Sequence, residues 1–178
     1  MFQKPAKINR GKHYDTCMTY LGQALRDHES AGGELLTVTE KRYACGLPLP
    51  PFQRPKKWTQ ERQIKFIESA WRDVPLDSFI IHRMDWESSG SPTPFSGWVV
   101  DGQQRLTAIE GYWKDEFPVF GARWSQLSKQ DQREFMLIKF PHYEIVASSE
   151  DEIKEMYLLM AFGGVAHTEE DRQHALKS

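Results

Sequence analysis

The residues best suited to chemistry lie in the middle of the chain, between an apolar run and a helical pattern. Residues 98–100 read Trp-Val-Val, residues 101–105 read Asp-Gly-Gln-Gln-Arg, and residues 106–113 carry apolar groups at helical spacing. The pattern predicts a buried strand followed by a helix, with the polar residues at the junction. The first N–H groups of a helix have no partner within it, and its dipole there favours negative charge. The junction therefore predicts an anion site.

The side chains of this junction suit a phosphate group. Gly102 has no Cβ, so a ligand can approach the backbone closely. Gln103 and Gln104 can donate further hydrogen bonds without adding charge, and Thr107 adds a hydroxyl in the first turn. Arg105 provides a planar fork of donors that matches phosphate oxygens.

Asp101 does not fit a simple phosphate site, because a carboxylate repels an anion. The repulsion disappears if Asp101 holds a divalent metal, or if it activates a water molecule or a hydroxyl group. The alternative is a purely structural junction, in which Asp101 caps the helix and Arg105 lies on a solvated face.

Two other segments could contribute to the same site. Residues 52–55 read Phe-Gln-Arg-Pro, and their prolines and aromatic neighbours would hold the Arg54 backbone rigid. Lys56, Lys57 and Arg62 surround Trp58 and could contact nucleic acid by charge and stacking. The alternatives are an exposed loop arginine and a solvated basic face.

A third segment contains a Gly-Gly pair at 163–164 and a hydroxyl at Thr168, just before a predicted short helix. The structural alternative for it is a helix C-cap followed by an N-cap.

The elements that must position these residues are both helical and extended. Helix patterns, with their capping residues, and β-rich runs follow one another without strict alternation, which favours an α+β fold over a doubly wound sheet. The expected helices cover 15–28 (capped by Asp15), 59–71 (capped by Thr59), 106–113, 128–136 (capped by Ser128), 149–162 and a short stretch from 168; the expected strands cover 35–43, 78–83, 98–100 and 138–146.

Length and charge narrow the classes of function. The 178 residues fit one domain, expected over 13–178 after a flexible basic arm at 1–12. With 23 basic and 25 acidic side chains, the net charge of −2 excludes a protein held to DNA by overall charge alone, although a local basic face could exist. The sequence shows no membrane span or signal peptide, so we expect a cytoplasmic protein, with Cys17 and Cys45 as free thiols. The six histidines show no zinc spacing.

The Gln-Arg segment, the Asp-Gly-Gln-Gln-Arg junction and the Gly-Gly segment, in this order, resemble a known family. They are similar to the DGQQR-motif branch of the ParB/sulfiredoxin-like superfamily, over about residues 35–176. That branch includes the N-terminal, nucleotide-hydrolysing domain of GmrSD-type, modification-dependent restriction enzymes. The resemblance implies a ParB/sulfiredoxin-like α+β fold, with a small mixed sheet and surrounding helices.

The resemblance also implies an activity. It suggests a domain that binds ATP, GTP, CTP or UTP and, with Mg²⁺, hydrolyses it or transfers a phosphoryl group, in a setting of DNA modification, restriction or counter-restriction. Carried over residue by residue, the catalytic group would be Asp101, Gln104, Arg105 and Arg54, with Asp101 also as the metal ligand. The binding group would be Gly102, Gln103, Thr107, Gln53 and Thr168.

Some features depart from the family pattern. Residues 160–164 read Met-Ala-Phe-Gly-Gly where the family often has an Asn-Arg pair before the glycines, and Ala108 replaces a common second Thr. The sequence carries no His-Asn-His-type nuclease motif, so a separate nuclease or other partner protein would be needed for restriction. These departures leave two alternatives open: a catalytically inert DNA- or partner-binding module of the same fold, and a domain that nicks DNA directly.

Overall fold

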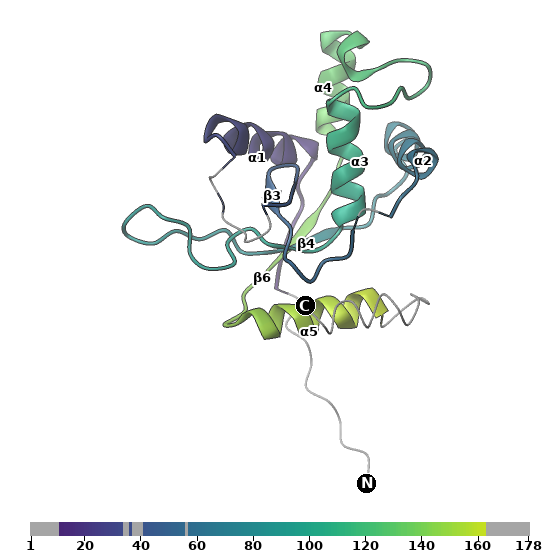
Figure 1. Ribbon diagram of the computed structural model, residues 1–178. Helices are drawn as coiled ribbons and strands as arrows, with labels where there is room; N and C mark the ends of the chain where they lie inside the picture. The colour runs from purple at the N-terminus through teal and green to yellow at the C-terminus, as the bar shows by residue number, and fades with distance from the viewer. Residues whose placement is uncertain (1–10, 34–35, 37–40, 56, 163–178) are drawn as a thin grey trace.

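The computed structural model describes residues 11–33, 36, 41–55 and 57–162 (Figure 1). Within them, helices and short strands are mixed along the chain. In order, the elements are β1 (Lys12–Tyr14), α1 (Met18–Ser30), β2 (Tyr43–Ala44), β3 (Leu47–Pro48), α2 (Gln60–Trp71), β4 (Phe79–His82), β5 (Val99–Asp101), α3 (Gln103–Trp113), the 3-10 helix η1 (Trp124–Gln126), α4 (Lys129–Leu137), β6 (His142–Ile145) and α5 (Glu150–Phe162).

The main sheet has four strands in the order β1-β6-β4-β5. β6 pairs antiparallel with β1 and parallel with β4, and β4 pairs antiparallel with β5. β2 and β3 form a separate two-stranded hairpin. The small mixed sheet with surrounding helices confirms the predicted α+β class.

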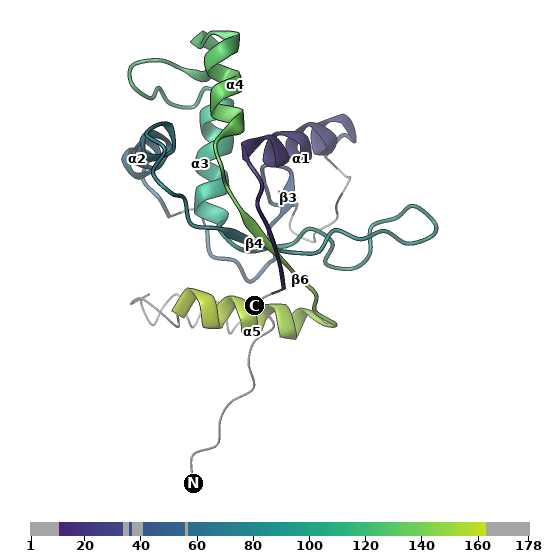
Figure 2. The ribbon, with the colours of Figure 1, turned by 180° about the vertical axis from the view of Figure 1, so that it is seen from behind.

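The sheet separates two apolar clusters, because successive side chains of a strand point to opposite faces. On β5, Val99 belongs to the larger cluster with Leu106 and Ile109 of α3, whereas Val100 packs with Ile153 of α5. Figures 1 and 2 show the corresponding layers, with α1, α2 and α3 on one side of the sheet and α5 on the other. α5 therefore packs against β5 on the face of the sheet opposite to α3.

Two of the predicted helix caps are confirmed. The Thr59 hydroxyl accepts a hydrogen bond from the Arg62 N–H at 3.3 Å, and the Ser128 hydroxyl accepts one from the Asp131 N–H at 3.1 Å. Such bonds satisfy N–H groups that the helix itself leaves unpaired.

The cap predicted at Asp15 is wrong. α1 begins at Met18 after Cys17, which makes no side-chain cap bond. The Asp15 carboxylate instead pairs with the Lys139 ammonium at 2.8 Å. An aspartate just before an apolar helical pattern favours a helix cap. The pattern cannot predict an ion pair such as Asp15–Lys139, because its two residues are far apart in the sequence.

The N-terminal part of the chain differs in detail from the prediction. Lys12 is already in the sheet, opposite Glu144, so β1 begins within the segment expected as an arm. Of the strand predicted over 35–43, residues 35 and 37–40 lie outside the described residues, as do residues 1–10 and the short helix expected from Thr168. Among the residues described, both cysteines are free, and no helix combines the length and apolar character needed to span a membrane.

Candidate functional site

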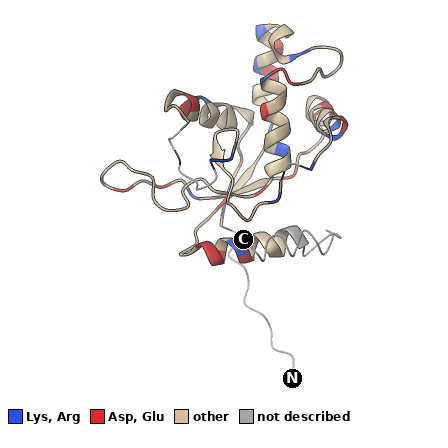
Figure 3. Ribbon diagram, viewed as in Figure 1, with Lys and Arg blue, Asp and Glu red and all other residues tan. Residues whose placement is uncertain are grey.

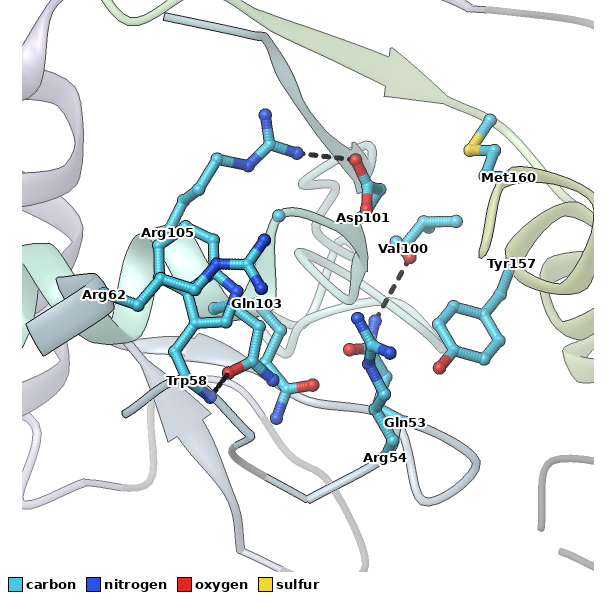
Figure 4. Close-up of a pocket in the computed structure, with 12 residues that line it drawn as sticks. Gln53, Arg54, Trp58, Arg62, Val100, Asp101, Gln103, Arg105, Tyr157 and Met160 are labelled. Atoms are coloured by element: carbon cyan, nitrogen blue, oxygen red, sulfur yellow. Dashed lines mark hydrogen bonds and ion pairs between the residues drawn. The ribbon is translucent and has the colours of Figure 1, made fainter. Parts of the chain in front are cut away.

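A pocket of about 330 Å³ opens where β5 meets α3 (Figure 4). It joins two segments that are about fifty positions apart in the sequence, the Gln-Arg loop before α2 and the junction before α3, and α5 adds one wall. The lining residues are Gln53, Arg54, Trp58, Arg62, Val100, Asp101, Gly102, Gln103, Gln104, Arg105, Tyr157 and Met160.

Gly102 shapes the junction. It is the N-cap of α3 and has φ +104°, a conformation that only glycine adopts readily. A Cβ at this position would lie 2.6 Å from the Cβ of Phe79, so the junction also lacks room for a side chain. α3 therefore begins directly at Gln103, and the structural alternative in which Asp101 caps the helix is wrong, because Gly102 is the N-cap and the Asp101 carboxylate bonds to Arg105 instead.

Arg105 is anchored rather than solvated. Its Nη1 donates to the carbonyl oxygens of Asp77 at 2.8 Å and Ser78 at 3.0 Å, and its Nη2 lies 2.6 Å from Oδ2 of Asp101. The Arg105 side chain is 15% exposed, whereas that of Asp101 is 46% exposed. The solvated-face alternative for Arg105 is thus wrong, and the ion pair fixes the Asp101 carboxylate at the pocket wall.

Gln104 and Gln53 are both buried and use their amides to hold the backbone. Oε1 of Gln104 accepts from the N–H groups of Lys57 at 3.0 Å and Trp58 at 3.1 Å. Nε2 of Gln53 donates to the carbonyl oxygens of Val99 and Val100. The two glutamines therefore tie the loop before α2 to β5 and α3.

Gln103 is different from the other glutamines. It lines the pocket and is only 6% exposed, yet its side chain makes no hydrogen bond with any residue that the structure describes. Buried polar groups in proteins are nearly always hydrogen-bonded to protein or ligand or ordered water. The Gln103 amide is therefore available to a molecule in the pocket.

The charge of the lining is mainly positive. Arg54, Arg62 and Arg105 contribute three guanidinium groups, and Asp101 contributes the single carboxylate among the lining residues. The Arg62 guanidinium lies over the Trp58 ring, 4.8 Å from its centroid. This excess of cations, next to unpaired N–H groups at a helix start, suits a ligand with several negative charges.

The two remaining predicted residues are Thr107 and Thr168. Thr107 is not among the lining residues, because its hydroxyl donates to the Gln103 carbonyl oxygen at 2.8 Å. Thr168 lies outside the described residues. Sequence reasoning missed Tyr157 and Met160, which α5 brings to the pocket. Their spacing of three is a helical signal, but it does not reveal which surface the helix covers.

The described residues include no cluster of three or more His, Cys, Asp or Glu that could hold a metal ion. Mg²⁺ does not need such a cage, because it is commonly held by one or two carboxylates together with substrate phosphates and water. With one oxygen paired to Arg105, Asp101 offers a second oxygen to such an ion. The pocket thus fits Mg²⁺ that arrives with phosphates, and does not fit a metal held by protein alone.

Comparison with protein families identifies the chain, whereas comparison with individual proteins does not. Searches of curated proteins and of solved structures gave no match. The family model described as the GmrSD restriction endonuclease, N-terminal domain, matches residues 34–174, which is most of the chain. The chain therefore belongs to the family of GmrSD restriction endonuclease N-terminal domains.

Proposed function

We propose that the protein binds a nucleoside triphosphate in the pocket before α3 and hydrolyses it, or transfers its phosphoryl group, in the restriction of modified DNA. Family membership supports the link to restriction. One observation carries the proposal for the site: Arg54 and Arg62 meet Asp101, Arg105 and the amide of Gln103, which bonds to none of the described residues, in one pocket.

In this proposal, some residues of the pocket bind the phosphates and others orient the reacting groups. The N–H groups at the start of α3 and the Gln103 amide would donate to phosphate oxygens, and Arg54 would neutralise charge that develops during transfer. Arg105 is a positioning residue, because its ion pair orients Asp101. Asp101 would then accept a proton from the attacking water or hydroxyl. Mg²⁺, when bound with the phosphates, would supply further neutralisation of their charge.

Calorimetric titration with ATP, GTP, CTP and UTP in the presence of Mg²⁺ tests the binding site. Arg54→Ala should weaken binding roughly ten- to a hundredfold, since a hydrogen bond to a charged group is lost. Arg83→Ala is the matched control, because Arg83 pairs with Asp85 and is not among the lining residues. If the wild type binds none of the four nucleotides, the proposal is wrong.

Phosphate release from the same nucleotides tests the chemistry. Asp101→Asn keeps the shape of the side chain and removes its basicity, so release should stop while nucleotide binding persists. Full activity in Asp101→Asn would contradict the role of Asp101 as the base.

A second candidate function, the inert DNA-binding module, is favoured by a different surface. A groove of about 390 Å³ between α1 and α4 is lined by three cations and no carboxylate, although α4 as a whole carries both signs of charge (Figure 3). Its residues are Arg26, Trp124, Lys129, Gln132, Arg133 and Met136. Such a groove suits DNA phosphates.

The two candidates give different results. A non-catalytic module would bind duplex DNA with strong salt dependence, weakened in the double variant of Lys129→Ala and Arg133→Ala, and would release no phosphate from any nucleotide. Phosphate release that is lost in Asp101→Asn would reject it.

A further inference from the structure

We infer that Trp58, together with Arg62, is the platform on which the base of the bound nucleotide stacks. This inference rests on the proposed function and adds the part of the ligand that the phosphate-binding residues do not explain. Figure 4 shows Trp58 and Arg62 on one side of the pocket, opposite Tyr157 and Met160. The pocket therefore has an aromatic end in addition to its cationic lining.

The Trp58 backbone is held from both neighbouring helices. Its N–H donates to Oε1 of Gln104, on α3, at 3.1 Å. Its carbonyl oxygen accepts from Nε2 of Gln63, on α2, at 3.2 Å. Two buried glutamines thus hold the backbone of one half-buried tryptophan in place.

The Trp58 ring is also fixed. It meets Phe66 edge to face, with centroids 5.6 Å apart, and Phe66 in turn packs against the buried Phe140. Aromatic pairs of this geometry stabilise both rings in place. The ring is therefore oriented before any ligand arrives, which lowers the entropy cost of binding.

The chemistry of the Trp58 ring suits a base rather than a phosphate. An indole face attracts cations and flat aromatic rings, and it offers nothing to a phosphate oxygen. Arg62 is exposed and adds a planar guanidinium over the ring, a group that stacks with bases and can donate to their edges. A base stacked on the Trp58–Arg62 pair would leave its triphosphate to the residues at the start of α3.

The test compares a nucleotide with inorganic triphosphate, which has the phosphates and no base. Calorimetry with Mg²⁺ measures both ligands on the wild type, Trp58→Ala, Trp58→Phe and the control Trp86→Ala, which removes an exposed tryptophan outside the pocket. Trp58→Ala should lose roughly ten- to a hundredfold in affinity for the nucleotide, the amount that one stacked base contributes. Its affinity for triphosphate should not change, and Trp58→Phe should keep most of the nucleotide affinity.

The outcomes separate the two proposals. If the wild type binds neither ligand, the proposed function fails and the inference with it. If the wild type binds both, and Trp58→Ala loses neither or loses both equally, the inference is overturned while the proposed function stands. Should Trp58→Ala fail to fold by circular dichroism, Trp58→Leu replaces it, because leucine retains apolar bulk without a π face. Equal nucleotide affinity in Trp58→Leu and Trp58→Phe would overturn the inference as well.

Discussion

Arg105 joins three parts of the protein through one guanidinium. It contacts the backbone just before β4 through two carbonyl oxygens, the end of β5 through Asp101, and it belongs to the first turn of α3. A lysine cannot replace these contacts, because a single ammonium lacks the planar fork. The residue therefore has a structural role and, in the proposed function, positions Asp101.

The first prediction concerns this residue. Arg105→Ala should lower the free energy of unfolding by about 1–2 kcal/mol, because two carbonyl oxygens and a carboxylate lose a charged donor. Urea denaturation measures the change. Arg83→Ala, which breaks a half-exposed pair with Asp85, should cost no more than about 0.5 kcal/mol. Equal losses in the two variants would show that the Arg105 contacts contribute nothing special to stability.

At this scale, the sequence predicted which residues gather but not what each one does. Asp101 to Arg105, Gln53 and Arg54 all line one pocket, as the resemblance implied. The amide of Gln104, however, bonds to the backbone of the loop before α2, and the amide of Gln53 bonds to the backbone of β5, two partners that the sequence could not place beside them. A glutamine's type gives its donors and acceptors, and only the fold gives their partners.

At the scale of elements, the turn from β5 into α3 determines the site. The strand is buried through Val99 and Val100, and the helix begins at Gln103, three positions after Val100. Only a residue without a Cβ allows so short a connection here, given the φ of Gly102 and the nearby Phe79.

The second prediction concerns that turn. Gly102→Ala should lower the free energy of unfolding by about 3 kcal/mol or more, because backbone strain adds to the clash with Phe79. Gly90→Ala is the matched control: Gly90 has φ +84°, but nothing lies within 4 Å of an added Cβ. It should cost only about 1 kcal/mol, from backbone strain alone. Thermal or urea unfolding of both variants checks the difference, and equal losses would show that the clash is relieved at no cost.

Long helices with capping residues and the apolar strands β4, β5 and β6 could be predicted, and the edge strand β1 could not. The caps at Thr59 and Ser128 act within four residues, so the local sequence contains the whole signal. β1 has three residues and exists because β6 pairs with it from more than a hundred positions away. Its sequence, Lys-His-Tyr, has no apolar alternation that would have marked it as a strand.

At the scale of the whole molecule, one buried histidine links stability to pH. His142 on β6 is 1% exposed and stacks on Tyr20 and Phe79. Burial lowers the pKa of His142 below its usual value, and His13 acts in the same direction, while Glu144 opposes them. The folded protein therefore holds this imidazole neutral.

The third prediction follows from the sign of that shift. Because the unfolded chain takes up the proton more readily, His142 favours folding fully above the unfolded pKa of about 6.5, and this contribution falls as the pH drops below it. Urea unfolding at about pH 7.5 and about pH 5 should show lower stability at the acidic value. His142→Gln should show a smaller difference between the two pH values. The same difference in wild type and variant would contradict this role.

The position of β6 in the sheet has a consequence for how the chain acquires its shape during synthesis. β6 lies between β1 and β4, so the first two of these three strands to leave the ribosome have no direct pairing with each other. β1 has no partner strand, and β4 lacks one of its two, until residues 142–145 have been made. Nascent chains that end before residue 142 would therefore expose unpaired strand edges, so a chaperone would matter most until β6 has emerged.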